Sequence, residues 1–273
     1  MTISETQRAS IGIFDSGVGG LTVCRKISEA LPRESIVYLG DTARVPYGSK
    51  SGETVVRYAR ACASLLLQRG IKMLVVACNT ASAFALDTLQ NSLDLPVVGV
   101  VEPGARAACR RTRSGRVGVI GTRGTVSTGS YEKIILRMRP DCRVFSKSCP
   151  LFVPFAEEGW TEGGAVREVA RTYLDDLLHH EIDTLVLGCT HYPLLAGVIS
   201  GVAGESVALV DSAEETASEV AATLKTEGLL NPSTKDGKHV FLVSDAPGPF
   251  RETGERFFGR ALERVEWVDI SGV

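Results

Sequence analysis

The stretch IKMLVVACNTAS, residues 71–82, decides the interpretation of this chain, because a related stretch, IDTLVLGCTHYP, occurs at residues 182–193. Each copy begins with an apolar, β-branched run, which is typical of a buried strand. A cysteine follows each run, and polar residues follow each cysteine. In the second copy, Pro193 favours the start of a helix. The repeat therefore predicts that Cys78 and Cys189 occupy equivalent places at the ends of two strands.

Two more pairs of segments share this repeat. IGIFDSGVGG (11–20) matches VGVIGTRGTV (117–126) loosely, and PVVGVVEPG (96–104) is similar to SVALVDSAE (206–214). The separation along the chain is about the same for all three pairs. The simplest explanation is a chain of two α/β halves of similar construction.

Apolar runs alternate with helical patterns along most of the chain. Segments Glu53–Gln68 and Ala165–His179 have apolar residues at helical spacing. The strand-like runs are Ile11–Phe14, Ile36–Leu39, Met73–Ala77, Val97–Val101, Val117–Ile120, Leu185–Leu187 and Val207–Val210. This alternation indicates parallel sheets covered by helices. We therefore predict an α/β fold with two pseudo-symmetric parallel-sheet domains.

The last part of the chain has no counterpart in the first half. It contains a helical pattern at Glu219–Glu227 and a strand-like run at 239–245. We expect it to return to the first domain, which would comprise residues 1–103 plus 217–273, with 104–216 as the second domain. Ligands of open parallel sheets bind beyond the carboxyl ends of the strands. Both cysteine loops lie at such ends, so the active site is expected in the interdomain cleft.

Composition excludes several classes of partner. The net charge of −2, without a block of like charges, does not favour nucleic-acid binding. No apolar run is long enough for a membrane span, so no membrane association is expected. The start, MTISETQRAS, lacks the apolar core of a signal peptide, which favours the cytoplasm. Seven cysteines without CxxC spacing favour free thiols in a reducing compartment over disulfides or a metal site.

The duplicated cysteine is compatible with several kinds of chemistry. A lone cysteine after a strand is usually a small buried hydrophobe, but packing does not easily explain an equivalent pair. Disulfide exchange requires sulfurs close enough to bond. Nucleophilic catalysis with His191 as base leaves Cys78 without a role. Proton transfer between two bases uses both thiols, one on each face of a substrate, and suits a reaction whose substrate and product are mirror images.

A thiol base needs support, because its ordinary pKa is roughly 8.5 and a carbon acid is a poor proton donor. His191 could supply a cation or relay a proton to Cys189. Asp15 precedes a Gly-rich turn, where it could tune a thiol or merely cap the turn. That turn is not GxGxxG, since Thr22 replaces the third glycine, so a dinucleotide site is disfavoured. Tyr47 and Gly48 could line a pocket or form an ordinary turn.

Four motifs together resemble the glutamate racemases of the cofactor-independent Asp/Glu racemase family. They are Ile13-Phe14-Asp15-Ser16-Gly17-Val18-Gly19-Gly20, Gly40-Asp41-Thr42-Ala43-Arg44-Val45-Pro46-Tyr47-Gly48, Ala77-Cys78-Asn79-Thr80-Ala81 and Gly188-Cys189-Thr190-His191-Tyr192-Pro193. They follow the family's order and spacing and span most of the chain.

This resemblance implies an isomerase that interconverts L- and D-glutamate without a cofactor or metal and supplies D-glutamate for peptidoglycan and the cell wall. It implies that Cys78 acts on the D-enantiomer and Cys189 on the L-enantiomer, assisted by Asp15, Glu157 and His191. The substrate-binding positions that it implies are Asp15, Ser16, Tyr47, Gly48, Asn79, Thr80, Thr190 and His191. Family members are often dimers, which suggests a homodimer of undefined geometry.

Other functions remain open from the residues alone. Aspartate racemase belongs to the same family. A Cys-dependent hydrolase or isomerase of another small acid is a further alternative, although the GxSxG turn of many hydrolases is absent. No feature of the sequence indicates regulation through protein binding. The remaining cysteines are interpreted as structural: Cys24, Cys62, Cys109, Cys142 and Cys149.

Overall fold

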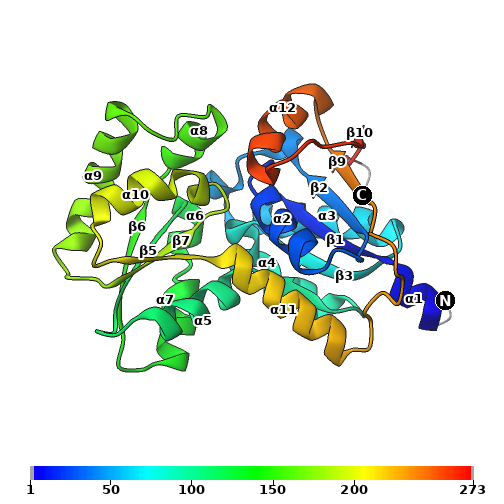
Figure 1. Cartoon of the computed structure of the whole chain (residues 1–273), viewed down its shortest axis with the longest axis horizontal. Helices are drawn as coiled ribbons and strands as arrows, with labels where there is room; N and C mark the ends of the chain where they lie inside the picture. The colour runs from blue at the N-terminus through cyan, green and yellow to red at the C-terminus, as the bar shows by residue number, and fades with distance from the viewer. Residues whose placement is uncertain (1–2, 272–273) are drawn as a thin grey trace.

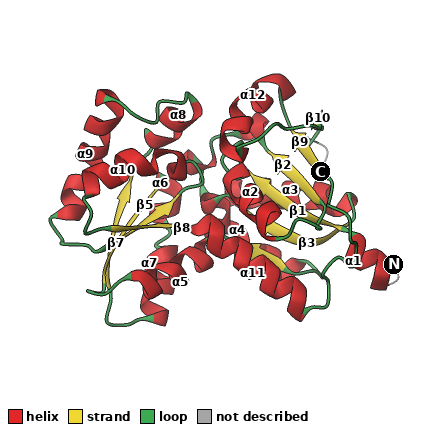
Figure 2. Cartoon of the chain, viewed as in Figure 1, coloured by secondary structure: helices red, strands yellow, loops and turns green. Residues whose placement is uncertain are grey.

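The computed structural model, which describes residues 3–271, places the strands in two parallel sheets (Figures 1 and 2). The first sheet has six strands in the order β10-β9-β2-β1-β3-β4, and the second has four in the order β6-β5-β7-β8. Every strand pair in both sheets is parallel. The predicted α/β fold with two parallel-sheet halves is confirmed.

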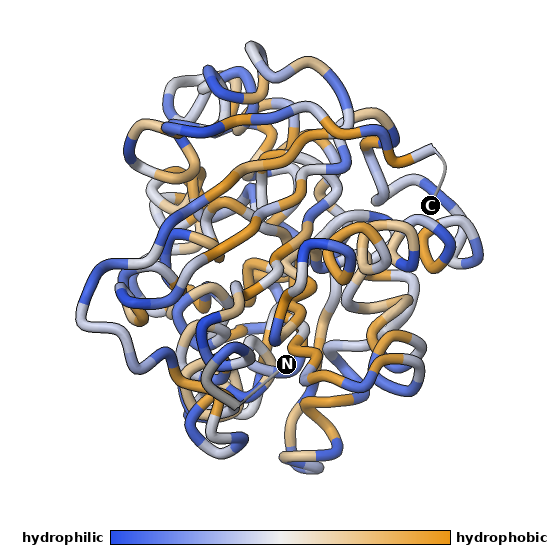
Figure 3. The backbone as a smooth tube through the Cα atoms, turned by 90° about the vertical axis from the view of Figure 1, so that its right-hand side faces the viewer, coloured by the Kyte–Doolittle hydropathy of each residue, from blue (hydrophilic) through white to orange (hydrophobic). Residues whose placement is uncertain are grey.

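The strand bounds agree with most of the apolar runs. The first sheet contains β1 (Ser10–Asp15), β2 (Ile36–Gly40), β3 (Ile71–Val76), β4 (Val97–Gly99), β9 (His239–Val243) and β10 (Val265–Trp267). The second contains β5 (Arg116–Gly121), β6 (Arg143–Ser148), β7 (Thr184–Gly188) and β8 (Ala208–Asp211). Figure 3 shows the hydrophobic runs along the strands of the first sheet.

The two sheets share one strand order. The sequence β2-β1-β3-β4 in the first sheet corresponds to β6-β5-β7-β8 in the second. Strands β3 and β7 are therefore equivalent, and these are the strands that precede Cys78 and Cys189. The internal repeat of the sequence corresponds to this repeated arrangement.

Two strands were absent from the sequence prediction. β6 (RVFSKS) has no fully buried residue, so its sequence lacks the continuous apolar run of the other strands. It lies at the edge of its sheet, where polar as well as apolar side chains are tolerated. β10 contains only three residues and is also an edge strand. Apolar runs predict buried strands better than exposed ones: the edge strand β4 is fully buried and was predicted, whereas β6 and β10 are partly exposed.

Helices fill the connections between strands. Their bounds are α1 (Ile3–Arg8), α2 (Leu21–Ala30), α3 (Gly52–Gln68), α4 (Asn79–Ser92), α5 (Val101–Arg111), α6 (Arg123–Ser127), α7 (Ser130–Met138), α8 (Phe152–Glu157), α9 (Gly164–Leu178), α10 (Ala196–Ala203), α11 (Ser212–Thr226) and α12 (Pro247–Phe258). Short 3₁₀ helices are η1 (Thr42–Arg44), η2 (Tyr47–Ser49) and η3 (Tyr192–Leu195). No helix among residues 3–271 is long and apolar enough to cross a membrane.

Some helix predictions need correction at their ends. The helix expected at Pro193 begins as the 3₁₀ turn η3 and continues as α10. The helix predicted at Glu219–Glu227 is the second half of α11, which begins at Ser212. The side chain of Asp211 caps α11 by accepting a hydrogen bond from the N–H of Ala213 (2.9 Å). The predicted helix starts seven residues too late, because Asp211 was not recognised as its N-cap.

After α11, the chain returns to the first sheet, where β9 pairs with β2. The predicted boundaries at 103/104 and 216/217 fall inside α5 and α11, which pack against each other. The exact division into domains stays a prediction. The return is anchored by the buried Lys72 on β3, which donates to the carboxylate of Glu34 and to the carbonyl of Leu229 (2.8 Å). Breaking such a buried ion pair typically costs about 3–5 kcal/mol.

Candidate active site

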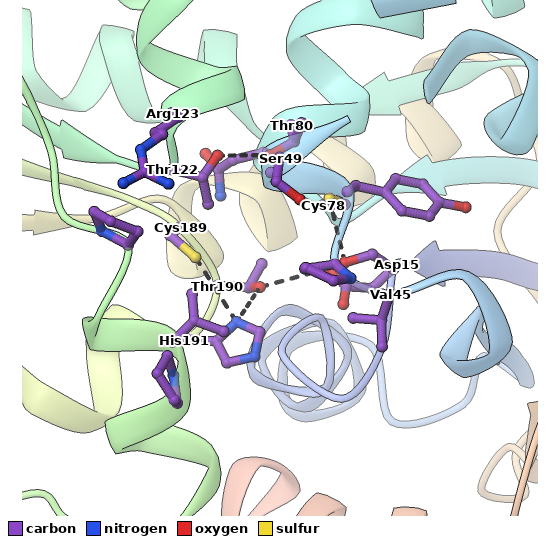
Figure 4. A pocket seen from close by; sticks show the side chains of 18 residues that line it. Asp15, Val45, Ser49, Cys78, Thr80, Thr122, Arg123, Cys189, Thr190 and His191 are labelled. Atoms are coloured by element: carbon purple, nitrogen blue, oxygen red, sulfur yellow. Dashed lines mark hydrogen bonds between the residues drawn. The ribbon is translucent and has the colours of Figure 1, made fainter. Parts of the chain in front are cut away.

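A cavity lies where the carboxyl ends of strands from both sheets meet (Figure 4). Its lining residues come from both halves of the chain. They are Asp15, Ser16, Val45, Pro46, Tyr47, Gly48, Ser49, Cys78, Asn79, Thr80, Thr122, Arg123, Pro150, Val153, Pro154, Cys189, Thr190 and His191. The cavity thus contains both duplicated cysteines, as expected of a ligand site at the carboxyl ends of parallel strands.

The two thiols lie on opposite sides of this cavity (Figure 4). Cys78 follows β3 and is the N-cap of α4, where its Sγ accepts a hydrogen bond from the N–H of Ala81 (3.5 Å). Cys189 follows β7. Each cysteine is only 6% exposed, so the groups beside it determine its reactivity more than solvent does.

His191 and Glu157 form a chain of polar contacts behind Cys189. The Sγ of Cys189 lies 3.7 Å from His191 Nδ1, and His191 Nε2 lies 2.9 Å from Glu157 Oε1. Burial lowers the pKa of the His191 imidazole, but hydrogen bonds to Cys189 and Glu157 outweigh burial and raise this pKa to about 10. The raised pKa favours the protonated imidazole at neutral pH, and hence a positive charge beside Cys189.

Within residues 3–271, the hydrogen bonds of the Cys78 thiol involve Ser16 and Ala81 and no imidazole. The thiol donates to Ser16 Oγ over 3.8 Å. Burial and the negative charge of Asp15 raise the pKa of the Cys78 thiol to about 12, against smaller opposing effects of Ala81 and Ser16. The two halves are thus chemically unequal: Cys78 is held as a neutral thiol, whereas Cys189 has a cationic neighbour.

Asp15 lies at the end of β1 between the two thiol environments. It is 1% exposed and accepts hydrogen bonds from the N–H of Gly17 (2.8 Å) and from Thr190 Oγ1 (3.5 Å). Burial raises the pKa of this carboxyl, while the charge of His191 and backbone N–H groups lower it. Asp15 therefore links the Gly-rich turn of the first half to the Cys189 loop of the second.

Neutral hydrogen-bonding groups cover another part of the cavity. Asn79 accepts from the Tyr131 hydroxyl (2.7 Å), and its buried Nδ2 has no hydrogen-bond partner within residues 3–271. The hydroxyl of Thr80 lies 2.9 Å from that of Thr122 and 3.1 Å from that of Thr125. An unpartnered buried donor is costly unless a ligand accepts from it. These groups are suited to binding a carboxylate.

Two glycines allow the halves to approach each other closely. A Cβ on Gly19 would lie 2.3 Å from Thr190 Oγ1 and 2.5 Å from His191 Nδ1. A Cβ on Gly48 would lie 2.6 Å from the Cβ of Thr122. These positions require glycine because a side chain would occupy the space of a residue from the other half.

Two of the predicted site residues make contacts that their motifs did not predict. The hydroxyl of Tyr47 donates to the buried carboxylate of Asp41, although Tyr47 borders the cavity. Glu157 contacts His191 but is not itself a lining residue. The other predicted residues all line the cavity: Asp15, Ser16, Gly48, Cys78, Asn79, Thr80, Cys189, Thr190 and His191.

Sequence reasoning missed Ser49, Thr122, Thr125 and Arg123. Thr122 and Arg123 follow β5, as the Gly-rich turn follows β1. The alignment of residues 117–126 with 11–20 contained this information, because equivalent turns of two facing halves meet at one site. Within residues 3–271, no group of three or more His, Cys, Asp or Glu side chains is arranged to hold a metal ion.

Comparison with known proteins identifies relatives of this chain. The family model described as Asp/Glu/Hydantoin racemase matches residues 11–220. The glutamate racemase of Geobacter metallireducens is 58% identical over 261 residues, which cover 96% of this chain and 97% of that protein. The structure of the Francisella tularensis glutamate racemase in complex with D-glutamate is 35% identical, covers 98% of this chain and all of that one (100%), and has a TM-score of 0.92.

A more distant structure, the aspartate racemase of Picrophilus torridus, is 18% identical. It covers 80% of this chain and 94% of that one, with a TM-score of 0.57. At this level of sequence identity, the similarity shows a shared fold and nothing about function.

The contact between Glu157 and His191 generates a first prediction. Glu157→Gln removes a negative charge, so the pKa of the His191 imidazole should fall by about 1–3 units. Because folding raises the pKa of His191, its protonation stabilises the folded state. This contribution is complete below pH 6.5, the usual pKa of histidine, and is lost as the pH rises through about 10. The variant should therefore lose stability at neutral pH. NMR titration of the imidazole and urea unfolding check both effects.

The neighbouring exposed Glu158 provides the control. Glu158→Gln removes the same charge from the next residue of the chain and should leave the His191 titration unchanged. An unchanged titration in the Glu157 variant would contradict the assignment of Glu157 as the partner of His191.

Proposed function

This chain belongs to the Asp/Glu/Hydantoin racemase family, and we propose that it interconverts L- and D-glutamate by proton transfer between two thiols. It is an isomerase, as are the glutamate racemases that it resembles over nearly its full length. The observation that carries the proposed mechanism is the position of Cys78 and Cys189 on opposite sides of one cavity. The alternatives of an aspartate racemase and a Cys-dependent hydrolase have no comparable support.

In the direction from L- to D-glutamate, the Cys189 thiolate removes the α-proton. The C–H bond breaks, an S–H bond forms, and the electron pair remains on the α-carbon, delocalised into the α-carboxylate. The Cys78 thiol then donates its proton to the opposite face and becomes a thiolate. One proton leaves the substrate and one enters it, so the net change is inversion alone.

The surroundings of the thiols support these starting states. The protonated His191 favours a thiolate at Cys189, since a nearby cation stabilises the charged form. Burial and Asp15 favour a neutral thiol at Cys78. After one turnover the protonation states are exchanged: Cys189 is a thiol and Cys78 a thiolate. Reaction of D-glutamate restores the starting states, and so does loss of the Cys189 proton to solvent with uptake of a solvent proton by Cys78. Asp15, Glu157 and His191 serve as the assisting groups.

Substrate binding uses the remaining polar lining. Amide and hydroxyl donors of Asn79, Thr80 and Thr190 bind the carboxylates, and the buried Asn79 Nδ2 gains the acceptor that it lacks. Ser16 and the Tyr47–Gly48 turn complete the site in the first half. Asp15 is suited to the ammonium group, because it is the carboxylate among the lining residues.

Removal of either thiol tests the mechanism directly. Cys78→Ala and Cys189→Ala should each lower kcat for glutamate racemisation by about 10²–10⁴-fold, the usual contribution of a general acid or base. Loss of the α-proton signal in D₂O by NMR, together with circular dichroism of the substrate, measures exchange and inversion separately. The assay uses purified protein with added reductant and no added cofactor.

Cys142→Ala is the matched control, because this cysteine is buried but does not line the cavity. It should retain wild-type activity. Full racemisation by either active-site variant would rule out the two-thiol mechanism. Exchange without inversion in one variant would instead assign the remaining thiol to one face of the substrate.

Arg123 provides a test of carboxylate recognition. It is exposed at the cavity wall and has no ion-pair partner within the described residues 3–271. Arg123→Gln should raise KM for glutamate about 5-fold with little change in kcat, because an exposed ion pair contributes up to about 1 kcal/mol. The dependence of KM on NaCl should also weaken.

The control is Arg167→Gln, which removes an exposed arginine of α9 that does not line the cavity. Steady-state kinetics at two salt concentrations compare both variants with the wild type. Equal KM values for all three proteins would exclude Arg123 from substrate recognition.

We further propose that the protein acts in the cytoplasm as a homodimer and supplies D-glutamate for peptidoglycan. Membership of the family supports this setting.

Growth of a D-glutamate-requiring bacterium should be restored by the wild-type gene and not by the Cys78→Ala gene. Failure of the wild-type gene would count against the peptidoglycan role, and sedimentation as a monomer would count against the dimer.

A further inference from the structure

Helix α12 lies in the part of the chain that breaks the symmetry between the halves. It follows β9, and the second sheet has no strands equivalent to β9 and β10. In Figure 1, α12 lies beside the gap between the halves, next to α8 of the second half. The mechanism described above assigns no role to this helix.

Two neighbouring residues of α12 contact the groups behind Cys189. Arg256 Nη2 donates to the backbone carbonyl of Glu157, the last residue of α8. A cation is favourable at the carbonyl end of a helix. The ring of Phe257 meets His191 edge-on, with centroids 5.2 Å apart and an interplanar angle of 78°. Phe257 is fully buried, which fixes one side of the imidazole.

These contacts converge on one chain of groups. Glu157 Oε1 holds His191 Nε2, and His191 Nδ1 faces the Sγ of Cys189. Arg256 thus contacts the residue that orients the imidazole, and Phe257 contacts the imidazole itself. No hydrogen bond or ring contact within residues 3–271 joins α12 to Cys78. Any effect of these two side chains should therefore act directly on the surroundings of Cys189 and reach Cys78 only indirectly, through Asp15 and Cys189.

We propose that Arg256 and Phe257 are positioning residues that hold Glu157 and His191 in the orientation needed beside Cys189. This inference rests on the proposed function for its kinetic test, but not for its chemical test. Without Arg256, the end of α8 loses this hydrogen bond to the first half, and the Glu157 carboxylate is held less firmly against His191. Without the ring of Phe257, the imidazole loses a packing surface.

The charged groups around His191 define what a pH titration will report. Cys189 lies on its own loop, Glu157 faces it from α8, and Asp15 interacts with it from β1. From α12, the apolar ring of Phe257 faces the imidazole directly. Glu157, the negative partner contacted by Arg256, is therefore the group through which α12 should alter the titration of His191 and Cys189.

The chemical test measures alkylation of the two active-site thiols by iodoacetamide as a function of pH, with mass spectrometry to separate them. In Arg256→Met and in Phe257→Leu, the midpoint for Cys189 should rise by about one unit, the effect of weakening a nearby cation. The midpoint for Cys78 should change by much less, because it is coupled to these groups only through Asp15 and Cys189. Arg256→Lys should restore most of the wild-type behaviour, because it retains a donor and a charge.

Arg251→Met is the matched control, since Arg251 is an exposed arginine on the same helix without an ion-pair partner in the described chain. It should match the wild type in every measurement. Far-ultraviolet circular dichroism and urea unfolding verify that each variant folds. A wild-type Cys189 midpoint in both folded variants would overturn the inference, as would equal shifts of both thiols.

The kinetic test uses glutamate racemisation. Both variants should lower kcat about 3–10-fold with a smaller change in KM, because a displaced catalytic group impairs the reaction more than binding. The equilibrium constant of a racemisation is one, so kcat/KM must fall equally in both directions. The α-deuterium isotope effect, however, should grow with L-glutamate as substrate, since the Cys189 step becomes more limiting.

The two proposals fail in different ways. A wild-type protein that does not racemise glutamate would remove the proposed function, while the alkylation midpoints would still test the role of α12. A wild-type protein that racemises glutamate, with variants whose midpoints and isotope effects are unchanged, would overturn the role of α12 and leave the function intact.

Discussion

The close contact between the Gly-rich turn of the first half and the Cys189 loop of the second is the constraint on which the site depends. At Gly19, a single added carbon would lie 2.3 Å from the Thr190 hydroxyl oxygen. The same contact brings Asp15 within hydrogen-bond distance of Thr190. The two thiols follow strands of separate sheets, and without this close approach they could not both contact one small molecule. Glycine is thus a requirement of the interface between the halves.

The repeated fold provides two equivalent thiols, and their neighbours make them different. Cys78 and Cys189 follow strands at the same place in two sheets of the same order. The imidazole of His191, whose pKa is raised, lies beside Cys189, whereas burial and the carboxyl of Asp15 raise the pKa of the Cys78 thiol. For the racemisation that we propose, this combination is useful, because the two thiols lie on opposite sides of the cavity while their charged neighbours differ.

The structure confirms the fold that the sequence predicted, and the reasons are specific. Interior strands such as β3 and β7 are buried along their whole length, so their apolar runs were unmistakable. Edge strand β6 is half-exposed and was missed. The repeat predicted where both cysteines lie within their halves, whereas Thr122 and Arg123 were overlooked although their turn is equivalent to the Gly-rich turn of the first half.

Local sequence alone determined the interior strands, the two cysteine loops and the likeness of the two halves. These follow from burial patterns, which act over a few residues. Tertiary structure decided which polar groups meet: Glu157 with His191, Asp15 with Thr190, and Arg256 with the end of α8. Such contacts join residues up to 175 positions apart. The pKa values of the site depend on these contacts, because electrostatic interactions depend on distance in space and on burial. Neither quantity can be derived from residues that are adjacent in the sequence.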